Sequence, residues 1–286
     1  MTTTPPIDPK IFEEIAQRVR IIREEIADAA IRAARQPQDV ALVAVSKYAT
    51  PNDGVVEGLL RAGLRDLAEN RMQRLQEKIE YWSNQNPALC TNPPIQWFEN
   101  SNTVAENDPV RWHFIGPLQR NKARRVLSHA SLIHSVDSWK LLETLERILE
   151  EENDPNLRQD RQSRADEPIA HKFPEKTAVL LEVFISQDEN KQGFEPQKVL
   201  ETLERAAQLK RVVLCGLMGM AGLTATEDQT RKQFESLKIL FEQCRERFPE
   251  LTQFRELSIG MSHDFKLAIE QGATLVRIGS ALYPQR

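Results

Sequence analysis

The sequence predicts an α/β fold, a single-domain (β/α)8 TIM barrel over residues 1–286 with an N-terminal covering helix and two polar insertions. Short apolar segments alternate along the chain with segments of helical periodicity, and eight apolar segments of strand length occur. Several are almost continuously apolar, which is typical of strands that are covered on both faces. Alternating strands and helices imply parallel pairing, and eight such units close a barrel. An open doubly wound sheet is the alternative.

The first element is a long amphipathic helix over residues 8–35. Asp8 suits the N-cap, and Pro9 suits the first helical position because its fixed φ angle matches the helix. Apolar side chains then recur every three or four residues as far as Ala30, which is the spacing of one helix face. Only seven residues follow the last predicted strand, so we expect helix 8–35 to cover the barrel where an eighth helix would otherwise lie.

The remaining elements alternate regularly. The predicted strands are residues 41–47, 65–70, 111–116, 131–137, 178–185, 212–220, 254–261 and 274–279. The helices between them are residues 55–64, 71–82, 122–130, 139–151, 196–208, 231–248 and 265–273. Thr224 and Glu227 have the spacing of a capping box that opens the sixth of these helices.

Two polar stretches interrupt this alternation. Residues 83–109 contain six Asn and four Pro, and residues 150–176 are mostly charged or polar, so both are expected to be loops and not domains. Each follows a helix and precedes a strand, which places it at the N-terminal ends of the strands. Ligands of such barrels bind at the opposite, C-terminal ends. We therefore expect neither insertion to cover the ligand site.

Composition excludes several classes of function. A formal net charge of −4 lacks the positive surplus that non-specific binding to nucleic acids or anionic membranes needs. The three cysteines form no CxxC pair, and the five histidines show neither HxH nor HExxH, so no metal site is expected. The N-terminus lacks the features of a signal peptide, and the apolar runs are far shorter than the ~20 residues of a membrane-spanning helix. We expect a soluble, cytoplasmic protein.

Lys47 ends the first predicted strand, directly after the apolar run ALVAVS. In the mouth of a barrel an ammonium group is costly unless it is paired or deprotonated, and a deprotonated amine can form an imine with a carbonyl compound. Lys47 is therefore a candidate nucleophile. A lysine that simply extends into solvent is the alternative.

The ends of the last two strands suit an anion. Ser262 follows the seventh strand at the expected N-cap of the next helix, with Asp264 in the first turn, and Arg277, Gly279 and Ser280 close the eighth strand. Glycines let the main chain approach an anion closely, and a helix start offers free N–H donors. Loops after strands seven and eight form the recurrent phosphate site of this architecture. The sequence predicts a phosphate group there; a plain cap and a plain turn are the alternative.

Other polar residues near the strand ends are weaker candidates. Glu69 and Asn70 follow the second strand, His113 lies in the third and Met218 in the sixth. A histidine flanked by aromatic residues and a methionine in a strand are both typical of a core. Glycoside hydrolysis would need two facing carboxylates. Glu182 lies mid-strand, however, where its side chain is expected to point toward the helical layer and not toward Glu69.

Seven segments of this chain, in order over the eight strands, form a familiar set. They are AVSK (44–47), AEN (68–70), WHFIGPLQRNK (112–122), HSVDS (134–138), GLMGM (216–220), LSIGMSHDFKLAI (257–269) and VRIGSALY (276–283). With them the sequence resembles the pyridoxal phosphate homeostasis proteins, single-domain barrels related to the N-terminal domain of bacterial alanine racemase. The resemblance covers nearly the whole chain outside the insertions. Departures from the family pattern are Ala68, where glycine is usual, and Tyr283-Pro284, where Phe-Gly is usual.

The resemblance implies pyridoxal 5'-phosphate (PLP) as the cofactor, bound as a covalent aldimine on Lys47. It also implies an arginine, here Arg277, close to the pyridine nitrogen. A cation there would keep that nitrogen unprotonated and weaken the ring as an electron sink. The other positions that the resemblance implies are the phosphate-binding Ser262, Gly279 and Ser280 and the ring-lining Asn70, His113 and Met218.

Two functions of different classes follow from the resemblance. The first is a non-catalytic carrier that buffers PLP in vitamin B6 and amino-acid homeostasis and passes it transiently to PLP enzymes. The second is a racemase-like or decarboxylase enzyme. A racemase of this type, as the resemblance implies, adds a β domain after the barrel, whereas this sequence ends seven residues after the last strand. We therefore favour a monomeric carrier. A phosphate-binding barrel enzyme without the cofactor is a third reading.

Overall fold

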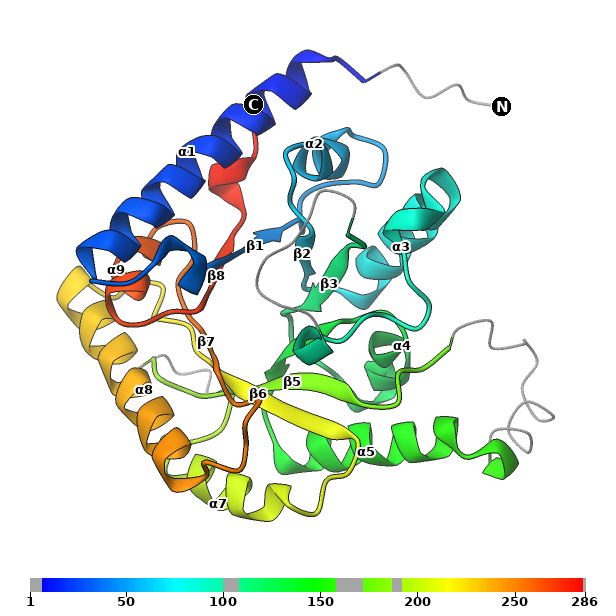
Figure 1. The fold of residues 1–286 in the computed structure, drawn as a ribbon, viewed down its shortest axis with the longest axis vertical. Coiled ribbons are helices and arrows are strands. Elements are labelled where there is room, and N and C mark those ends of the chain that lie inside the picture. Colours follow the sequence, from blue (N-terminus) through cyan, green and yellow to red (C-terminus); the bar gives the residue numbers. More distant parts are fainter. Residues whose placement is uncertain (1–6, 100–107, 158–171, 187–191, 285–286) are drawn as a thin grey trace.

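The computed structural model describes residues 7–99, 108–157, 172–186 and 192–284. Its strands form a closed barrel in which each strand pairs in parallel with its sequence neighbours and β8 returns to β1 (Figure 1). The strands are β1 (Ala41–Val45), β2 (Asp66–Glu69), β3 (Arg111–Phe114), β4 (Leu132–Val136), β5 (Thr177–Glu182), β6 (Val212–Met218), β7 (Glu256–Ser258) and β8 (Leu275–Ile278). The predicted barrel is confirmed, and the open sheet is wrong. Every strand ends before its apolar run does, so the last residues of each run belong to the loops of the barrel mouth.

Helices surround the barrel on its outside (Figure 1). They are α1 (Lys10–Arg32), α2 (Val55–Arg61), α3 (Met72–Gln85), α4 (Ala123–Leu127), α5 (Trp139–Asn153), α7 (Pro196–Ala206), α8 (Glu227–Arg247) and α9 (Phe265–Glu270). A short 3-10 turn, η5 (Ser280–Leu282), follows β8. Helix α8 starts after the N-cap Thr226, which forms a capping box with Gln229. The predicted box at Thr224 was therefore two residues too early.

Helix α1 contacts both α9 and α2, next to β8. Glu25 of α1 pairs with Lys266 of α9 at 2.8 Å, and the Arg35 guanidinium donates to the carbonyl of Ile269 at 3.1 Å. The predicted start is one residue too early, because Pro9 is the N-cap residue of α1 and Lys10 is its first residue; Asp8 precedes the cap and accepts a hydrogen bond from the Lys10 amide at 3.0 Å. The N-terminal helix thus covers the barrel where the sequence predicted.

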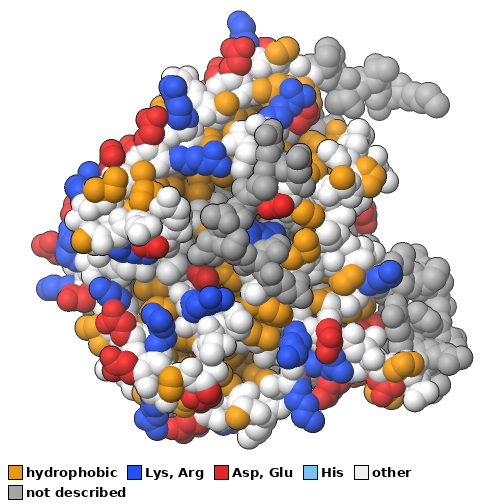
Figure 2. Space-filling model, viewed as in Figure 1, with side chains coloured by type: hydrophobic (Ala, Val, Ile, Leu, Met, Phe, Trp, Pro, Cys, Tyr) orange, Lys and Arg blue, Asp and Glu red, His pale blue; other side chains and the backbone are white. Residues whose placement is uncertain are grey.

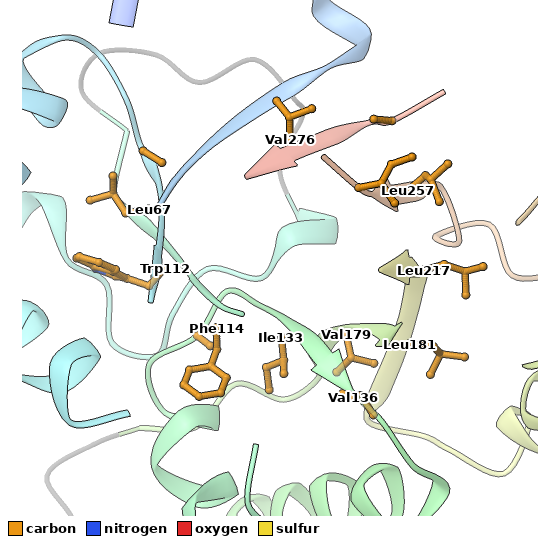
Figure 3. Close-up of a cluster of buried hydrophobic side chains, with 14 of the residues drawn as sticks. Leu67, Trp112, Phe114, Ile133, Val136, Val179, Leu181, Leu217, Leu257 and Val276 are labelled. Atoms are coloured by element: carbon orange, nitrogen blue, oxygen red, sulfur yellow. The ribbon is translucent and has the colours of Figure 1, made fainter. Parts of the chain in front are cut away.

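Successive side chains of a strand point to opposite faces, and the strands follow this alternation except at the register shifts of β4 with β5 and of β5 with β6. Figure 3 shows the outward set, which fills the layer between the barrel and the helices. Its labelled members are Leu67, Trp112, Phe114, Ile133, Val136, Val179, Leu181, Leu217, Leu257 and Val276. All of them are buried. Burying one such side chain stabilises the fold by about 1.5–3 kcal/mol, so this layer is the main apolar core.

A second, smaller cluster lies inside the barrel. Strand residues of the inward set form it, together with one residue that belongs to no strand. They are Val43, Val45, Ala68, Leu132, Ala178, Leu180, Cys215, Met218, Leu275 and Trp97. The other inward positions carry charged or polar side chains, and these form the polar part of the barrel interior.

Trp97, from the first insertion, closes the N-terminal end of this interior. Its indole Nε1 donates to Glu256 Oε1 at 3.0 Å, and its amide donates to the carbonyl of Ser131 at 3.1 Å. The Arg111 guanidinium lies 4.4 Å from its ring centroid. These three residues stand at or just before the first residues of β7, β4 and β3. The described part of insertion 83–109 therefore lies on the N-terminal face, as predicted, but the burial of Trp97 in the barrel was not foreseen.

The second insertion, 150–176, begins within α5 and ends at β5. Asn153 donates to the carbonyl of Pro174 at 3.1 Å, and the amide of Lys172 donates to Asn92 Oδ1 at 2.8 Å. Because Asn92 belongs to the first insertion, the described parts of both insertions meet on the N-terminal face. The prediction that neither covers the C-terminal strand ends holds for these parts; residues 100–107 of the first insertion and 158–171 of the second lie outside the described residues.

The molecular surface carries charges of both signs. On the face drawn in Figure 2, Lys and Arg side chains alternate with Asp and Glu side chains along the rim, and apolar side chains lie among them. The part of that face which is not grey has no extended area of positive charge, in keeping with the net charge of −4. Among the described helices, none is long and apolar enough to cross a membrane.

Replacing Trp97 with alanine is expected to lower the free energy of unfolding by about 3–5 kcal/mol, because a buried ring is lost from a packed interior. Urea unfolding measures this change. Ile31→Ala is the control: Ile31 is 63% exposed on α1, and its replacement is expected to stay within about 0.5 kcal/mol of the parent. Equal stability of the Trp97→Ala protein and its parent would show that the indole is not part of the barrel core.

Candidate site at the C-terminal mouth of the barrel

Lys47 stands just beyond the end of β1, two residues after Val45. Val43 and Val45 both face the barrel interior, so the alternation brings Lys47 to the same, inward side at the mouth. The Lys47 side chain is exposed, and its Nζ lies 5.0 Å from the ring centroid of Tyr48. The amine is therefore accessible, and the desolvation that the sequence argument invoked is not found here.

A buried ion pair lies behind this residue. Lys78 of α3 and Glu69 of β2 have fully buried side chains and are joined by a hydrogen bond from Nζ to Oε1. Lys78 Nζ also donates to the carbonyl of Ser46 at 2.7 Å. Burial lowers the pKa of Lys78, and the charge of Glu69 opposes that effect. The pair thus holds the peptide that precedes Lys47.

Sequence reasoning missed Lys78, although a signal was present. The buried residues of α3 are Met72, Leu75, Lys78 and Trp82, so the lysine occupies a position of the apolar stripe. A lysine at such a position needs a buried anion. Glu69, one of the two carboxylates weighed from the sequence as a facing pair, is engaged with Lys78 on the helix side of the barrel.

The loops after β7 and β8 meet, as the predicted phosphate site requires. The Gly279 amide donates to Ser262 Oγ at 3.2 Å, and the Arg277 amide donates to the carbonyl of Gly260 at 3.0 Å. Gly260 has φ +89°, and a Cβ there would lie 2.5 Å from Ala268 Cβ, so only glycine fits. Ser280 follows, exposed, as the first residue of η5.

The predicted capping role of Ser262 is wrong. Helix α9 begins at Phe265, and Asp264 is its N-cap residue. Asp264 Oδ1 accepts the amide of Met261 at 2.5 Å, which closes a turn ahead of the helix. Ser262 lies inside that turn. Its hydroxyl is therefore directed at the β8 loop and not at the helix.

Arg277 is a buried cation on the inward side of β8. Its Nη1 donates to the carbonyl oxygen and to Oγ of Ser258, at 2.8 and 2.6 Å, and its Nη2 donates to the carbonyl of Gly219 at 3.1 Å. Burial lowers the pKa of Arg277 to about 10, against the opposing charges of Asp264 and Glu182. The guanidinium therefore stays charged at neutral pH.

Glu182 corrects a sequence prediction, because its side chain faces the barrel interior and not the helices. It follows Ala178 and Leu180 of the interior cluster at two-residue steps. It also pairs in register with Met218, which is buried in that cluster. Glu69 is engaged on the other side of the barrel wall, so the two carboxylates do not face each other.

Burial raises the pKa of Glu182 to about 7. The carboxylate of Asp137 adds to this increase, while Arg277 and a 3.3 Å hydrogen bond from Gln192 Nε2 oppose it. The mouth therefore holds an acid that titrates near neutral pH beside a permanent cation. The sequence did not predict this inward position of Glu182, because a glutamate in a strand can face either side of the barrel wall.

Asn70 and His113 lie at different depths. Asn70 follows β2, half-buried at the mouth, where Gly116 approaches so closely that a Cβ would lie 2.1 Å from the Asn70 carbonyl oxygen. His113 is fully buried deeper in the barrel. Its Nε2 lies 3.2 Å from Asp66 Oδ1, and its Nδ1 lies 2.9 Å from His134 Nε2. His113 thus belongs to an interior network that reaches the mouth through other residues.

The barrel has an accessible lysine after its first strand, a buried arginine on its eighth strand and converging loops after its last two strands. This combination of fold and site defines a class of barrel proteins. The family model that matches is the alanine racemase N-terminal domain, over residues 22–286, and the chain belongs to this class. Within it, the curated relatives show the particular family. The chain belongs to the pyridoxal phosphate homeostasis proteins.

Two of these relatives and one solved structure illustrate the match. A pyridoxal phosphate homeostasis protein of Synechocystis sp. is 33% identical over 250 residues, which are 87% of this chain and 93% of the relative. That of Escherichia coli K12 is 30% identical over 278 residues, 96% of this chain and 98% of the relative. The structure of PipY from Synechococcus elongatus with PLP bound superposes with a TM-score of 0.68 at 27% identity, covering 94% of this chain and 100% of PipY.

The free energy of unfolding of the parent protein is expected to fall between acid and neutral pH because Glu182 ionises. The Glu182→Gln protein should lack this fall. The pKa of Glu182 rises from 4.5 to about 7 on folding, so its contribution to stability is full below pH 4.5 and is lost as the pH rises through 7. At 1.36 kcal/mol per pKa unit, the amide variant should be more stable than the parent at pH 8 by about 3 kcal/mol, and by much less at pH 4.5.

Urea unfolding at both pH values measures this difference. Glu175→Gln, at an exposed residue ahead of β5, is the control and should shift stability equally at the two pH values. A Glu182→Gln protein that differs from its parent by the same amount at pH 4.5 and pH 8 would contradict the assignment.

Proposed function

We propose that this protein binds PLP reversibly at the C-terminal mouth of the barrel, held as a Schiff base on Lys47, and buffers the cofactor without catalytic turnover. The observation that carries the proposal is the grouping of three features at one mouth: the accessible Lys47 amine, the buried Arg277 cation and the contact between Ser262 and Gly279. The PLP-bound PipY structure, which has the same fold, supports it.

The residues present fit the chemistry of this cofactor. An exposed primary amine can condense with an aldehyde, forming a C=N bond and releasing water, and PLP supplies the aldehyde. Ser262 Oγ accepts the Gly279 amide and keeps its own hydrogen to donate, and Ser280, next in the chain, adds a hydroxyl and a main-chain amide; such donors suit a phosphate group. Asn70, Met218 and, from deeper in the barrel, His113 would complete the surroundings of the ring.

Arg277 supports a carrier over an enzyme. Amino-acid chemistry on PLP uses the ring as an electron sink, and a protonated pyridine nitrogen strengthens that sink. Arg277 has only donor hydrogens and stays charged, so a pyridine nitrogen beside it would accept a hydrogen bond and stay unprotonated. The arrangement therefore favours holding the cofactor over activating it.

The relatives favour the same choice. Proteins that match this chain over nearly their whole length are named for PLP homeostasis and not for racemisation. The proposal accordingly includes a role in vitamin B6 and amino-acid balance, as a cytoplasmic monomer that passes PLP to enzymes needing it. Size-exclusion chromatography with light scattering tests the monomer, with a dimer mass contradicting it.

Lys47→Ala is expected to abolish the visible absorbance that the parent protein gains with PLP, because no amine is left at that position. Borohydride treatment of the parent, followed by peptide mass spectrometry, should place a stable phosphopyridoxyl adduct on Lys47. Lys176→Ala, at an exposed lysine just before β5 on the opposite end of the barrel, is the matched control and should keep the absorbance. A colourless parent protein, or an adduct on another lysine, would refute the role of Lys47.

Ser262→Ala should weaken binding of PLP but not of pyridoxal, which lacks the phosphate. A hydrogen bond to a charged group is worth about 1.5–3 kcal/mol, so the dissociation constant for PLP should rise about tenfold or more. Equilibrium dialysis with both ligands measures the ratio. Ser236→Ala, on the exposed side of α8, should leave both constants unchanged. Equal losses for PLP and pyridoxal would place the phosphate elsewhere.

A further inference from the structure

A continuous line of hydrogen bonds runs down the inside of the barrel from Arg277. Arg277 Nη1 lies 2.6 Å from Ser258 Oγ, which lies 2.9 Å from His134 Nδ1. His134 Nε2 lies 2.9 Å from His113 Nδ1, and His113 Nε2 lies 3.2 Å from Asp66 Oδ1. All five residues are buried, on β8, β7, β4, β3 and β2. The line joins the mouth to the N-terminal half of the interior.

The direction of every proton in this line is determined by its first member. A guanidinium can only donate, so Ser258 Oγ accepts from Arg277. The Ser258 hydroxyl then gives its own hydrogen to His134 Nδ1, which is its other partner among the described residues. His134 therefore carries its proton on Nε2 and donates it to His113 Nδ1. His113 in turn carries its proton on Nε2 and donates it to Asp66.

The other end imposes the same direction. Arg111 donates to both carboxylate oxygens of Asp66, at 2.6 and 2.7 Å. Burial raises the pKa of Asp66, but the hydrogen bond from His113 and the charge of Arg111 outweigh it, so the pKa lies below its usual value. An ionised carboxylate can only accept. Both ends thus require two neutral histidines in the Nε2–H form.

The charged groups around the histidines agree with this state. Arg277 faces His134, and Asp66, Arg111 and Glu256 face His113. Burial places the pKa of His134 well below 6.5, helped by the neighbouring His113 and Arg277. It also lowers the pKa of His113, although Asp66 opposes the effect. A proton added to either ring would break the line of donors.

We propose that Ser258 and His134 are positioning residues for Arg277, holding its guanidinium toward the mouth through this one-way line of donors. The inference rests on the proposed function, in which Arg277 faces the pyridine ring. Two other anchors, the main-chain carbonyls of Ser258 and Gly219, hold the same guanidinium. Loss of the Ser258 hydroxyl therefore leaves these two hydrogen bonds of Arg277 in place and changes only the direction in which the guanidinium points.

The first test reads the protons directly and needs no cofactor. Long-range 15N–1H NMR on the full chain labelled with 15N-histidine is expected to show His134 and His113 as Nε2–H tautomers, without titration from pH 6 to pH 8. His134→Gln and His113→Gln assign the signals. An Nδ1–H tautomer or an imidazolium at pH 7 for either residue would overturn the proposal.

The second test concerns the cofactor. Ser258→Ala is expected to raise the dissociation constant for PLP about tenfold, the loss of one hydrogen bond to a charged group. It should also shift the pH profile of the visible absorbance of bound PLP, whereas Ser258→Thr, which keeps a hydroxyl, should restore the parent profile. Ser131→Ala is the matched control: Ser131 is equally buried, and its hydroxyl has no hydrogen-bond partner among the described residues.

The outcomes separate this inference from the proposed function. If the parent protein binds no PLP, the proposed function fails, while the NMR result still decides the line of donors. If Ser258→Ala binds PLP with the affinity and pH profile of the parent, the positioning role fails and the proposed function stands. A change of affinity shared by Ser258→Ala and Ser131→Ala would show a structural effect only, and would also reject the positioning role.

Discussion

The architecture of the mouth depends on one buried cation. A guanidinium cannot give up its charge at neutral pH, so inside a barrel it needs acceptors on every side. Arg277 obtains them from the carbonyl and hydroxyl of Ser258 and from the carbonyl of Gly219, and these residues come from β7 and the end of β6. The same requirement that draws the ends of β6, β7 and β8 together also holds a buried positive charge on the inward side of β8, near its C-terminal end.

The barrel interior is graded along its axis. At the N-terminal end Trp97 and the Asp66–Arg111 pair close it with an indole ring and a buried ion pair. In the middle, His113 and His134 carry a single direction of hydrogen bonding. At the C-terminal end lie the buried, interacting Arg277 and Glu182 and, just beyond the end of β1, the exposed Lys47. Polar groups inside the barrel are thus not spread evenly; they connect the closed end to the open one.

The sequence predicted the barrel because near-continuous apolar runs and amphipathic helices are direct consequences of strands that are covered on both sides. It located Lys47, Ser262, Arg277 and Gly279 because strand ends are recognisable from those runs. It could not predict which side of a strand Glu182 faces. Side chains alternate with every residue, and β5 carries apolar residues on both of its faces, so the sequence pattern does not mark which face is inward.

Two further features lay beyond periodicity. Trp97 belongs to a segment without regular spacing, so its insertion into the barrel depends on tertiary contacts, among them those with Glu256, Ser131 and Arg111. The line of hydrogen bonds from Arg277 to Asp66 requires residues from five strands to meet, and no local sequence pattern predicts that they do. The buried ion pair of Lys78, by contrast, was predictable from periodicity, since a lysine in the apolar stripe of α3 needs a buried anionic partner.

The central claim is that a permanently charged Arg277, directed by its neighbours, faces the ring nitrogen of the bound cofactor. The 15N NMR shift of PLP labelled at the pyridine nitrogen, measured on the complex from pH 6 to pH 9, tests it most directly. The account predicts the shift of an unprotonated nitrogen that accepts a hydrogen bond, and its movement in an Arg277→Lys complex. A pyridinium shift in the parent complex at neutral pH would contradict the account.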